Sequence, residues 1–328
     1  MIDRLDAFQR AHPWVGYPLA VIYKYVDDQG PYQAALITYY AFVSLFPLLL
    51  VLVTGLGFLV GDDPALRQRL VDSAVGQFPV VGERLRDAAH PLRGSGAGMA
   101  FGLAVALYGG LGVGQALQNS VNRAWNVPRG DRPNPFHARA RSLVLLFILA
   151  AAVAVTAMSS TLTEIAVRLG GVGGQFERTI GMVGAAVVDT GLIFAAFKLL
   201  TARDLGWKVL VPGAAVASVV WQVLQRFGSG YVRHELSHAD RLYGLFGTVF
   251  AIIAWIYVAA IVILLVTEGM TVAVDRLWPR ALMSPVTDDA PLTGADRRAY
   301  RLYVKAQRFK GQEKVHTHFD EDHPPPDE

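Results

Sequence analysis

The clearest pattern in this sequence is a series of long apolar stretches separated by shorter polar ones. The first stretch, residues 34–60, contains no charged side chain over 27 positions. As a helix it would be about 40 Å long, which exceeds the ~30 Å hydrocarbon core of a bilayer. Five further stretches follow, and together they predict an all-α protein with six transmembrane helices, at about residues 34–60, 98–121, 143–163, 179–200, 209–224 and 243–274. In the second stretch the glycine pairs Gly98/Gly102 and Gly110/Gly114, each spaced by four, predict a close approach to neighbouring helices.

Polar segments flank and connect these stretches. Residues 1–33 are polar and aromatic, which is typical of a membrane interface, and they lack the pattern of a cleaved signal peptide. In the connection 61–97 apolar residues recur every four positions, so we expect an amphipathic helical extracytoplasmic loop. That loop packs on its own protein, lies in the membrane plane or binds a partner.

The last segment, residues 279–328, is basic and then acidic. Thr293 and Asp296 have the spacing of a helix start, and the residues that follow are rich in arginine and lysine. Such a helix either contacts anionic lipid headgroups or forms a solvated tail that enforces topology. The candidate headgroup contacts are Lys198, Arg297, Arg298, Arg301, Lys305 and Arg308. The acidic end of the tail is expected to be disordered.

Composition and charge agree with a membrane protein. The chain of 328 residues is 53% hydrophobic and 17% charged, with a mean hydropathy of +0.34, whereas soluble domains carry about 25% charged residues. In the six-span arrangement 20 of the 30 Lys and Arg residues fall on the side of the two termini. The positive-inside rule therefore predicts cytoplasmic termini in a bacterial plasma membrane. The absence of cysteine excludes disulfides and thiolate zinc sites.

Several motifs resemble one family. These are the run from Tyr39 to Leu48, the basic stretch from Arg123 to Val127, and Tyr243-Gly244, Trp255-Ile256-Tyr257 and Glu268 near the end of the last span. They are similar to motifs of the YihY/BrkB (YhjD-like) family of bacterial inner-membrane proteins, although Val266-Thr267 stands where that family has Gly-Ala. The resemblance implies a six-span envelope protein whose relatives are linked to envelope integrity and lipid export, and which formerly carried a ribonuclease BN label.

The ribonuclease label can be tested on the residues. Metal-dependent RNA hydrolysis needs clustered His or carboxylate ligands. The nearest group is the run from His316 to His323, but its spacing does not fit a metallo-nuclease because Glu321 stands where a third histidine is needed. We therefore predict no enzyme activity, no metal site, no cofactor and no nucleic-acid partner.

Polar residues inside the predicted spans are the candidates for a substrate or ion cavity, because polar groups are costly at membrane depth. Asp189 is the most informative, since its nearest cations in sequence are too far along the helix to pair with it. Glu268 and Lys198 are expected to lie toward the same ends of their spans. They either pair with each other or, as is commoner for lysine, Lys198 extends to the headgroups. The full set is Thr38, Ser44, Gln115, Asn119, Asn122, Asp189 and Glu268. For Asp189 the alternative is a structural hydrogen bond between helices, and for the hydroxyls of Thr38 and Ser44 it is a hydrogen bond to their own backbone.

Three functions remain open at this point. The first is transport of a lipid or a small amphipathic solute through a polar cavity in the membrane. The second is a non-transporting envelope scaffold that docks partners through the loop 61–97 and the basic tail. A membrane-embedded hydrolase is the least favoured. Lipids are the expected partners, and neither the substrate nor the oligomeric state follows from the sequence.

Overall fold

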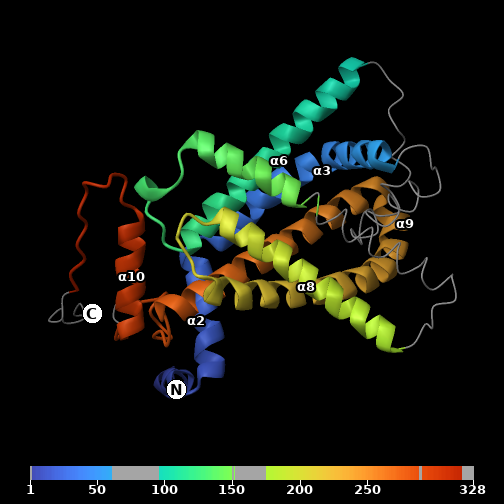
Figure 1. The fold of residues 1–328 in the computed structure, drawn as a ribbon. Coiled ribbons are helices and arrows are strands. Elements are labelled where there is room, and N and C mark those ends of the chain that lie inside the picture. The colour runs from blue at the N-terminus through green and yellow to red at the C-terminus, as the bar shows by residue number, and fades with distance from the viewer. Residues whose placement is uncertain (1, 61–95, 150, 152–174, 288–289, 320–328) are drawn as a thin grey trace.

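The structure is a computed structural model that describes residues 2–60, 96–149, 151, 175–287 and 290–319 (Figure 1). Every regular element in those ranges is helical and none is a strand, which confirms the all-helical fold for this part of the chain. The elements are α1 (Ile2–Ala11), α2 (Pro13–Asp27), α3 (Gly30–Val60), α6 (Gly96–Ala124), the short 3-10 helix η1 (Arg129–Asp131), a helix over residues 135–149, α8 (Gln175–Leu200), α9 (Trp207–Asp275) and α10 (Gly294–Ala306).

The helices coincide with most of the predicted spans. Helices α3, α6 and α8 contain the first, second and fourth of them, and α3 begins four residues before the predicted start. The third predicted span starts in the helix of residues 135–149 and otherwise lies outside the described residues, as does the loop 61–95. Two segments of the described chain are long and apolar enough to cross a membrane, Trp207–Gln225 and Val249–Asp275. The complete six-span topology stays a prediction.

Helix α9 contains both of these segments. The predicted connection 227–242 is helical, and the ribbon turns back there so that the two arms of α9 run beside each other (Figure 1). Where the arms meet, a methyl group at Gly213 would overlap the side chain of Met270. The arms therefore pack closely at this point, and a larger residue at position 213 would require the flexible Met270 side chain to move.

Glycines also bring α3, α6 and the helix 135–149 together. A Cβ added at Gly109 would lie 2.9 Å from the backbone Cα of Ser44 on α3. The predicted glycine pair Gly110 and Gly114 faces the helix 135–149, where a Cβ at Gly114 would lie 2.6 Å from the Cβ of Ser142. These contacts confirm the close helix approach that the spacing of the pair predicts.

Two apolar clusters hold one end of the bundle. The larger joins α6, α8 and α9, and includes Trp125, Phe197 and Leu264, which are almost fully buried. The smaller joins α2, α9 and α10 through Ala20, Val272 and Ala299, each with no exposed surface. The N-terminal helices and α10 consequently lie at the same end of the long helices (Figure 1).

Helix α10 has the predicted start. The Thr293 hydroxyl accepts a hydrogen bond from the backbone N–H of Asp296, and the Asp296 carboxylate accepts one from the backbone N–H of Thr293. This reciprocal arrangement is the capping box that the spacing predicts. The acidic end of the tail, residues 320–328, lies outside the described residues.

Candidate functional site

The most unusual feature of the structure is a buried group of three charged side chains. Lys24 on α2 has no exposed surface, and its ammonium group pairs with the carboxylate of Asp28 one turn later. The same Nζ atom lies 3.3 Å from Oε2 of Glu268 on α9, a residue that is 2% exposed. We call Lys24, Asp28 and Glu268 the ion trio.

The face of α2 that packs on α9 positions this trio. Tyr17, Ala20 and Lys24 follow one another at spacings of three and four, so they share a side of the helix. The Tyr17 hydroxyl donates a 2.6 Å hydrogen bond to the backbone carbonyl of Gly269, while Ala20 packs against Val272. These contacts place Lys24 next to Glu268, the residue that precedes Gly269.

The electrostatics of the trio are unbalanced. Burial by itself would lower the pKa of Lys24, but the carboxylates of Glu268 and Asp28 raise it above its ordinary value, so this ammonium is charged at neutral pH. One cation faces two carboxylates, and burying an uncompensated charge is costly. The Tyr25 hydroxyl on the next residue is also buried and has no hydrogen-bond partner among the described residues.

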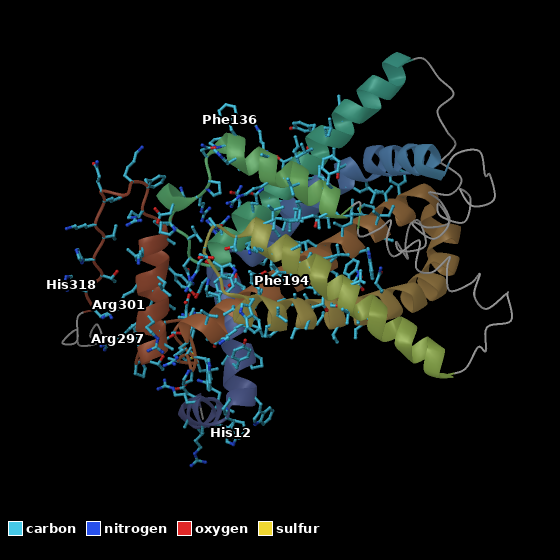
Figure 2. All side chains as sticks on the ribbon, in the orientation of Figure 1. His12, Phe136, Phe194, Arg297, Arg301 and His318 are labelled. Atoms are coloured by element: carbon cyan, nitrogen blue, oxygen red, sulfur yellow. The ribbon has the colours of Figure 1, made fainter. Side chains whose placement is uncertain are left out.

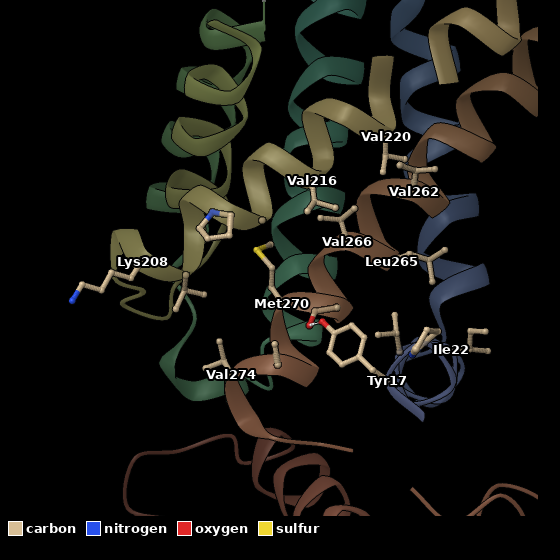
Figure 3. A pocket seen from close by; sticks show the side chains of 17 residues that line it. Tyr17, Ile22, Lys208, Val216, Val220, Val262, Leu265, Val266, Met270 and Val274 are labelled. Atoms are coloured by element: carbon tan, nitrogen blue, oxygen red, sulfur yellow. Dashed lines mark hydrogen bonds between the residues drawn. The ribbon is translucent and has the colours of Figure 1, made fainter. Parts of the chain in front are cut away.

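An apolar groove of about 770 Å³ runs beside the trio (Figure 3). One wall comes from α2 and the other from both arms of α9. Most of its lining is apolar, including Val216, Val262 and Leu265, with Tyr17 and Lys208 as polar members. Gly269 lines the groove and Glu268 belongs to the trio, so the two features meet at consecutive residues of α9.

A second group of buried charges fixes the C-terminal segment. Arg280 is 1% exposed, and its guanidinium pairs with Asp296 at 2.8 Å and with Asp27 on α2 at 2.7 Å. The rings of Tyr23 and Tyr300 lie on this guanidinium, 5.7 and 5.4 Å from its carbon atom. Burial would raise the pKa of Asp296, but hydrogen bonds from Arg280, Ala281 and Thr293 hold it below its ordinary value. Arg280 thus connects α2 to α10.

The structure places the seven predicted cavity residues in several different surroundings. The hydroxyls of Thr38 and Ser44 donate to carbonyls of their own helix. Asn122 is buried and joins α6 to the end of α8, because its amide nitrogen donates to the Leu200 carbonyl and its amide oxygen accepts from the Ala202 backbone N–H. Glu268 belongs to the ion trio.

Of the three remaining residues, only Asn119 shares a pocket with a member of the trio, Asp28. Gln115 is half-buried on α6, and Asn119 is exposed and lines a separate polar pocket. Asp189 is half-buried on α8 and has no ion pair or hydrogen bond within the described part of the chain. Of the seven residues, only Asn119 lines either of the two pockets described, so one shared cavity stays a prediction.

The predicted headgroup residues are also distributed over several surroundings. Lys198 and Lys305 are exposed, and Glu268 has Lys24 rather than Lys198 as its partner. Arg298 donates to the backbone carbonyl of Arg276, and Arg308 pairs with Asp131 at 2.7 Å. The guanidinium groups of Arg297 and Arg301 lie over the ring of Phe319, on the outer side of α10 (Figure 2).

Sequence reasoning did not find Lys24, Asp28 or Arg280. The local sequence around Lys24 is typical of an interfacial segment, and its partner Glu268 is far away in the chain. The spacing of four between Lys24 and Asp28 was the one available signal. Within the described ranges no group of three His, Asp or Glu side chains is arranged to hold a metal ion.

Comparison with known proteins gives two relatives and one family. The chain is 24% identical to the UPF0761 membrane protein PSHAa0171 of Pseudoalteromonas translucida over 274 residues, which cover 81% of this chain and 88% of that protein. It is 22% identical to the ribonuclease-like protein YfkH of Bacillus subtilis over 260 residues, covering 74% of this chain and 89% of that protein. No solved structure matches the chain.

The family model described as Virulence factor BrkB matches residues 21–280. That range begins within α2 and ends at Arg280, so it includes the ion trio, the groove except for Tyr17 and Pro18, and the residue that connects α2 to α10. The match covers most of the chain, and a membrane-protein relative aligns over nearly its whole length. The chain therefore belongs to the BrkB family and is a membrane protein.

Proposed function

We propose that this protein is a transport-type protein of the bacterial inner membrane that moves a lipid or a small amphipathic solute. The observation that carries the proposal is the ion trio at the edge of the apolar groove. An intramembrane ionisable residue is generally associated with a substrate or ion pathway. Here Glu268 lies within one of the two membrane-length helices and faces a lysine from another element.

The groove suggests the kind of substrate. Its volume is within the ~300–1,000 Å³ range of small-molecule sites. Because both arms of α9 are apolar enough to lie in a bilayer, a groove between them and α2 would meet hydrocarbon, and an acyl chain is the natural occupant. Tyr17 and Lys208 offer polar contacts for the other part of an amphipathic molecule.

The groove and the trio are mechanically linked. Tyr17 lines the groove and Lys24 belongs to the trio, and both are on α2. A substrate that displaces α2 from Gly269 would also change the distance between Lys24 and Glu268. The second carboxylate of the trio, Asp28, gives Lys24 an alternative partner after such a movement. In this proposal both termini are cytoplasmic, in agreement with the distribution of Lys and Arg.

Proteoliposomes containing a fluorescent phosphatidylglycerol test the proposal. A membrane-impermeant quencher removes only the outer-leaflet signal unless the protein moves lipid between leaflets. We expect wild-type protein to increase the quenched fraction, Glu268→Gln and Lys24→Met to abolish the increase, and Lys198→Met to leave it unchanged. Lys198 is the matched control because it is an exposed lysine outside the trio. A wild-type protein that leaves the inner-leaflet signal intact would refute lipid transport.

The scaffold alternative has one supporting observation. Arg298, Arg301 and Lys305 are exposed at spacings of three and four along one face of α10, which is held against the protein by Arg280. A scaffold of this kind predicts that replacing the three residues by glutamine abolishes complementation in cells while lipid movement in proteoliposomes is unchanged. A transport protein predicts that Glu268→Gln abolishes both lipid movement in proteoliposomes and complementation in cells.

A further inference from the structure

A polar pocket of about 490 Å³ lies at the end of α6, separate from the apolar groove. The junction of α2 and α3, the 3-10 helix η1 and the end of α10 form its other walls. Six polar or charged side chains of this lining matter for its chemistry, namely Asp27, Asp28, Arg123, Asn126, Arg129 and Arg132.

The two acidic side chains of the pocket already have buried cations as partners. Asp27 pairs with Arg280 at 2.7 Å and Asp28 pairs with Lys24, and both of these cations are about 1% exposed or less. Each of these cations is shared with a second carboxylate, Glu268 for Lys24 and Asp296 for Arg280. Neither Asp27 nor Asp28 forms an ion pair with an arginine of the pocket in the part of the chain that the structure describes.

The three arginines make only uncharged contacts. Arg123 donates to the Asp28 backbone carbonyl and to the Gln29 side-chain oxygen, and Arg132 donates to the Val127 carbonyl. Arg129 lies over the ring of Phe309 at 5.0 Å. The acidic residue next to them, Asp131, pairs with Arg308 instead. None of the three arginines has an ion-pair partner among the described residues.

The other two arginines act on Arg132. Burial lowers the pKa of Arg132 most, the positive charges of Arg123 and Arg129 lower it further, and the charge of Asp28 raises it. Because no carboxylate among the described residues pairs directly with these guanidinium groups, a bound anion would reduce the repulsion among them.

Asn126 supplies an unused donor at the same place. It is 7% exposed, lines the pocket, and neither its side-chain nitrogen nor its side-chain oxygen has a hydrogen-bond partner in the structure described. Its backbone has a positive φ of 52°, and its N–H donates to the Arg123 carbonyl. Buried polar groups without partners are rare and costly, so this amide is best explained by a ligand.

We propose that this pocket binds a phosphate-type anion through the guanidinium groups of Arg123, Arg129 and Arg132 and the side-chain amide of Asn126. Arginine presents several N–H donors in a planar fork that matches phosphate oxygens, and charge-assisted bonds of this kind are about twice as strong as neutral ones. The proposal goes beyond transport and does not depend on it, since it uses neither the groove nor Glu268. The anion is either a soluble phosphate or the phosphate of a lipid headgroup.

Full-length protein in nanodiscs separates these two sources. In discs of phosphatidylcholine alone, titration with inorganic phosphate and with glycerol 3-phosphate measures binding of a soluble anion by calorimetry. In discs that also contain phosphatidylglycerol, native mass spectrometry measures the retained anionic lipid. Binding in either arm supports the site and identifies the source. Absence of binding in both arms overturns the proposal.

Three variants assign the binding to the pocket. Arg129→Gln changes an exposed side chain and is expected to leave the fold intact while it weakens binding about tenfold. Asn126→Asp keeps a residue type that tolerates positive φ and places a carboxylate in the pocket, so binding should be lost. Arg139→Gln removes an equal charge from an exposed position outside the pocket and should bind like the wild type. Equal weakening by Arg129→Gln and Arg139→Gln would show a diffuse charge effect and refute the site.

Discussion

The ammonium group of Lys24 lies 3.3 Å from the carboxylate of Glu268, and both side chains are buried. One residue comes from a helix near the start of the chain and the other from the end of a membrane-length helix. The N-terminal segment is thus an internal part of the fold at this point, rather than a segment that only rests on the membrane surface. The positive charge of Lys24 and the negative charge of Glu268 are each compensated inside the protein by the other.

Removing Lys24 alone should destabilise the protein severely. Lys24→Met leaves the buried carboxylate of Glu268 without its cation, which typically costs about 3–5 kcal/mol. Thermal unfolding of the detergent-solubilised protein measures this as a lower melting temperature. The double variant Lys24→Met/Glu268→Gln should recover much of the loss because no buried charge is left unpaired at α9. A double variant less stable than Lys24→Met would contradict the pairing.

Arg280 should determine whether α10 stays docked. Arg280→Gln removes ion pairs to both Asp296 and Asp27, so chymotrypsin should cut α10 at Tyr300 and Tyr303 much faster than in the wild type. Lys305→Gln is the matched control, since Lys305 is an exposed cation on the same helix. Unchanged cleavage in Arg280→Gln would mean that the apolar contacts of Ala299 suffice to hold the helix.

The docking of α10 should also depend on pH. The pKa of Asp296 is lower in the folded protein than in the unfolded chain, so its contribution is complete above about pH 4 and is lost as the pH falls through the folded value. Hydrogen–deuterium exchange of the α10 peptide, corrected for the intrinsic pH effect, should show constant protection from pH 7 to pH 5 and a steep loss below pH ~4. In the Asp296→Asn variant the α10 peptide should be less protected from exchange at pH 7, and its protection should change little with pH.

The glycine at the contact of α3 and α6 should not tolerate a methyl group. In Gly109→Ala the added Cβ would lie 2.6 Å from the Cβ and 2.9 Å from the Cα of Ser44, so one backbone must shift. We expect a loss of about 1–3 kcal/mol, seen as a lower melting temperature. Gly191→Ala on α8 meets nothing within 4 Å and should keep or slightly raise that temperature. Equal effects of the two variants would refute close packing at Gly109.

Features that depend on local sequence could be predicted. The long apolar helices follow from uninterrupted apolar runs, and the start of α10 follows from Thr293 and Asp296, which satisfy each other's backbone groups within one turn. Gly110 and Gly114 predicted a close helix contact because they repeat on one face of α6. Each of these signals lies within a few residues of the structure it specifies.

The candidate site could not be predicted in the same way, because its partners are distant in the chain. Nothing near Lys24 indicates that Glu268 will neutralise it, and nothing near Arg280 indicates Asp27. Asn122 was a cavity candidate on polarity alone, but its side chain binds the backbone at the end of α8. A polar residue in an apolar run shows that a partner is needed without showing which one.

The contact between Arg280 and Asp27 has a consequence for the order of synthesis. A ribosome completes Asp27 early, but the arginine that neutralises it is added only after the last long helix has been made. During translation α2 therefore has an incomplete binding surface, and this end of the molecule can close only as a late step of biogenesis. The carboxylate of Asp27 is available to water, lipid or assisting proteins throughout the preceding interval.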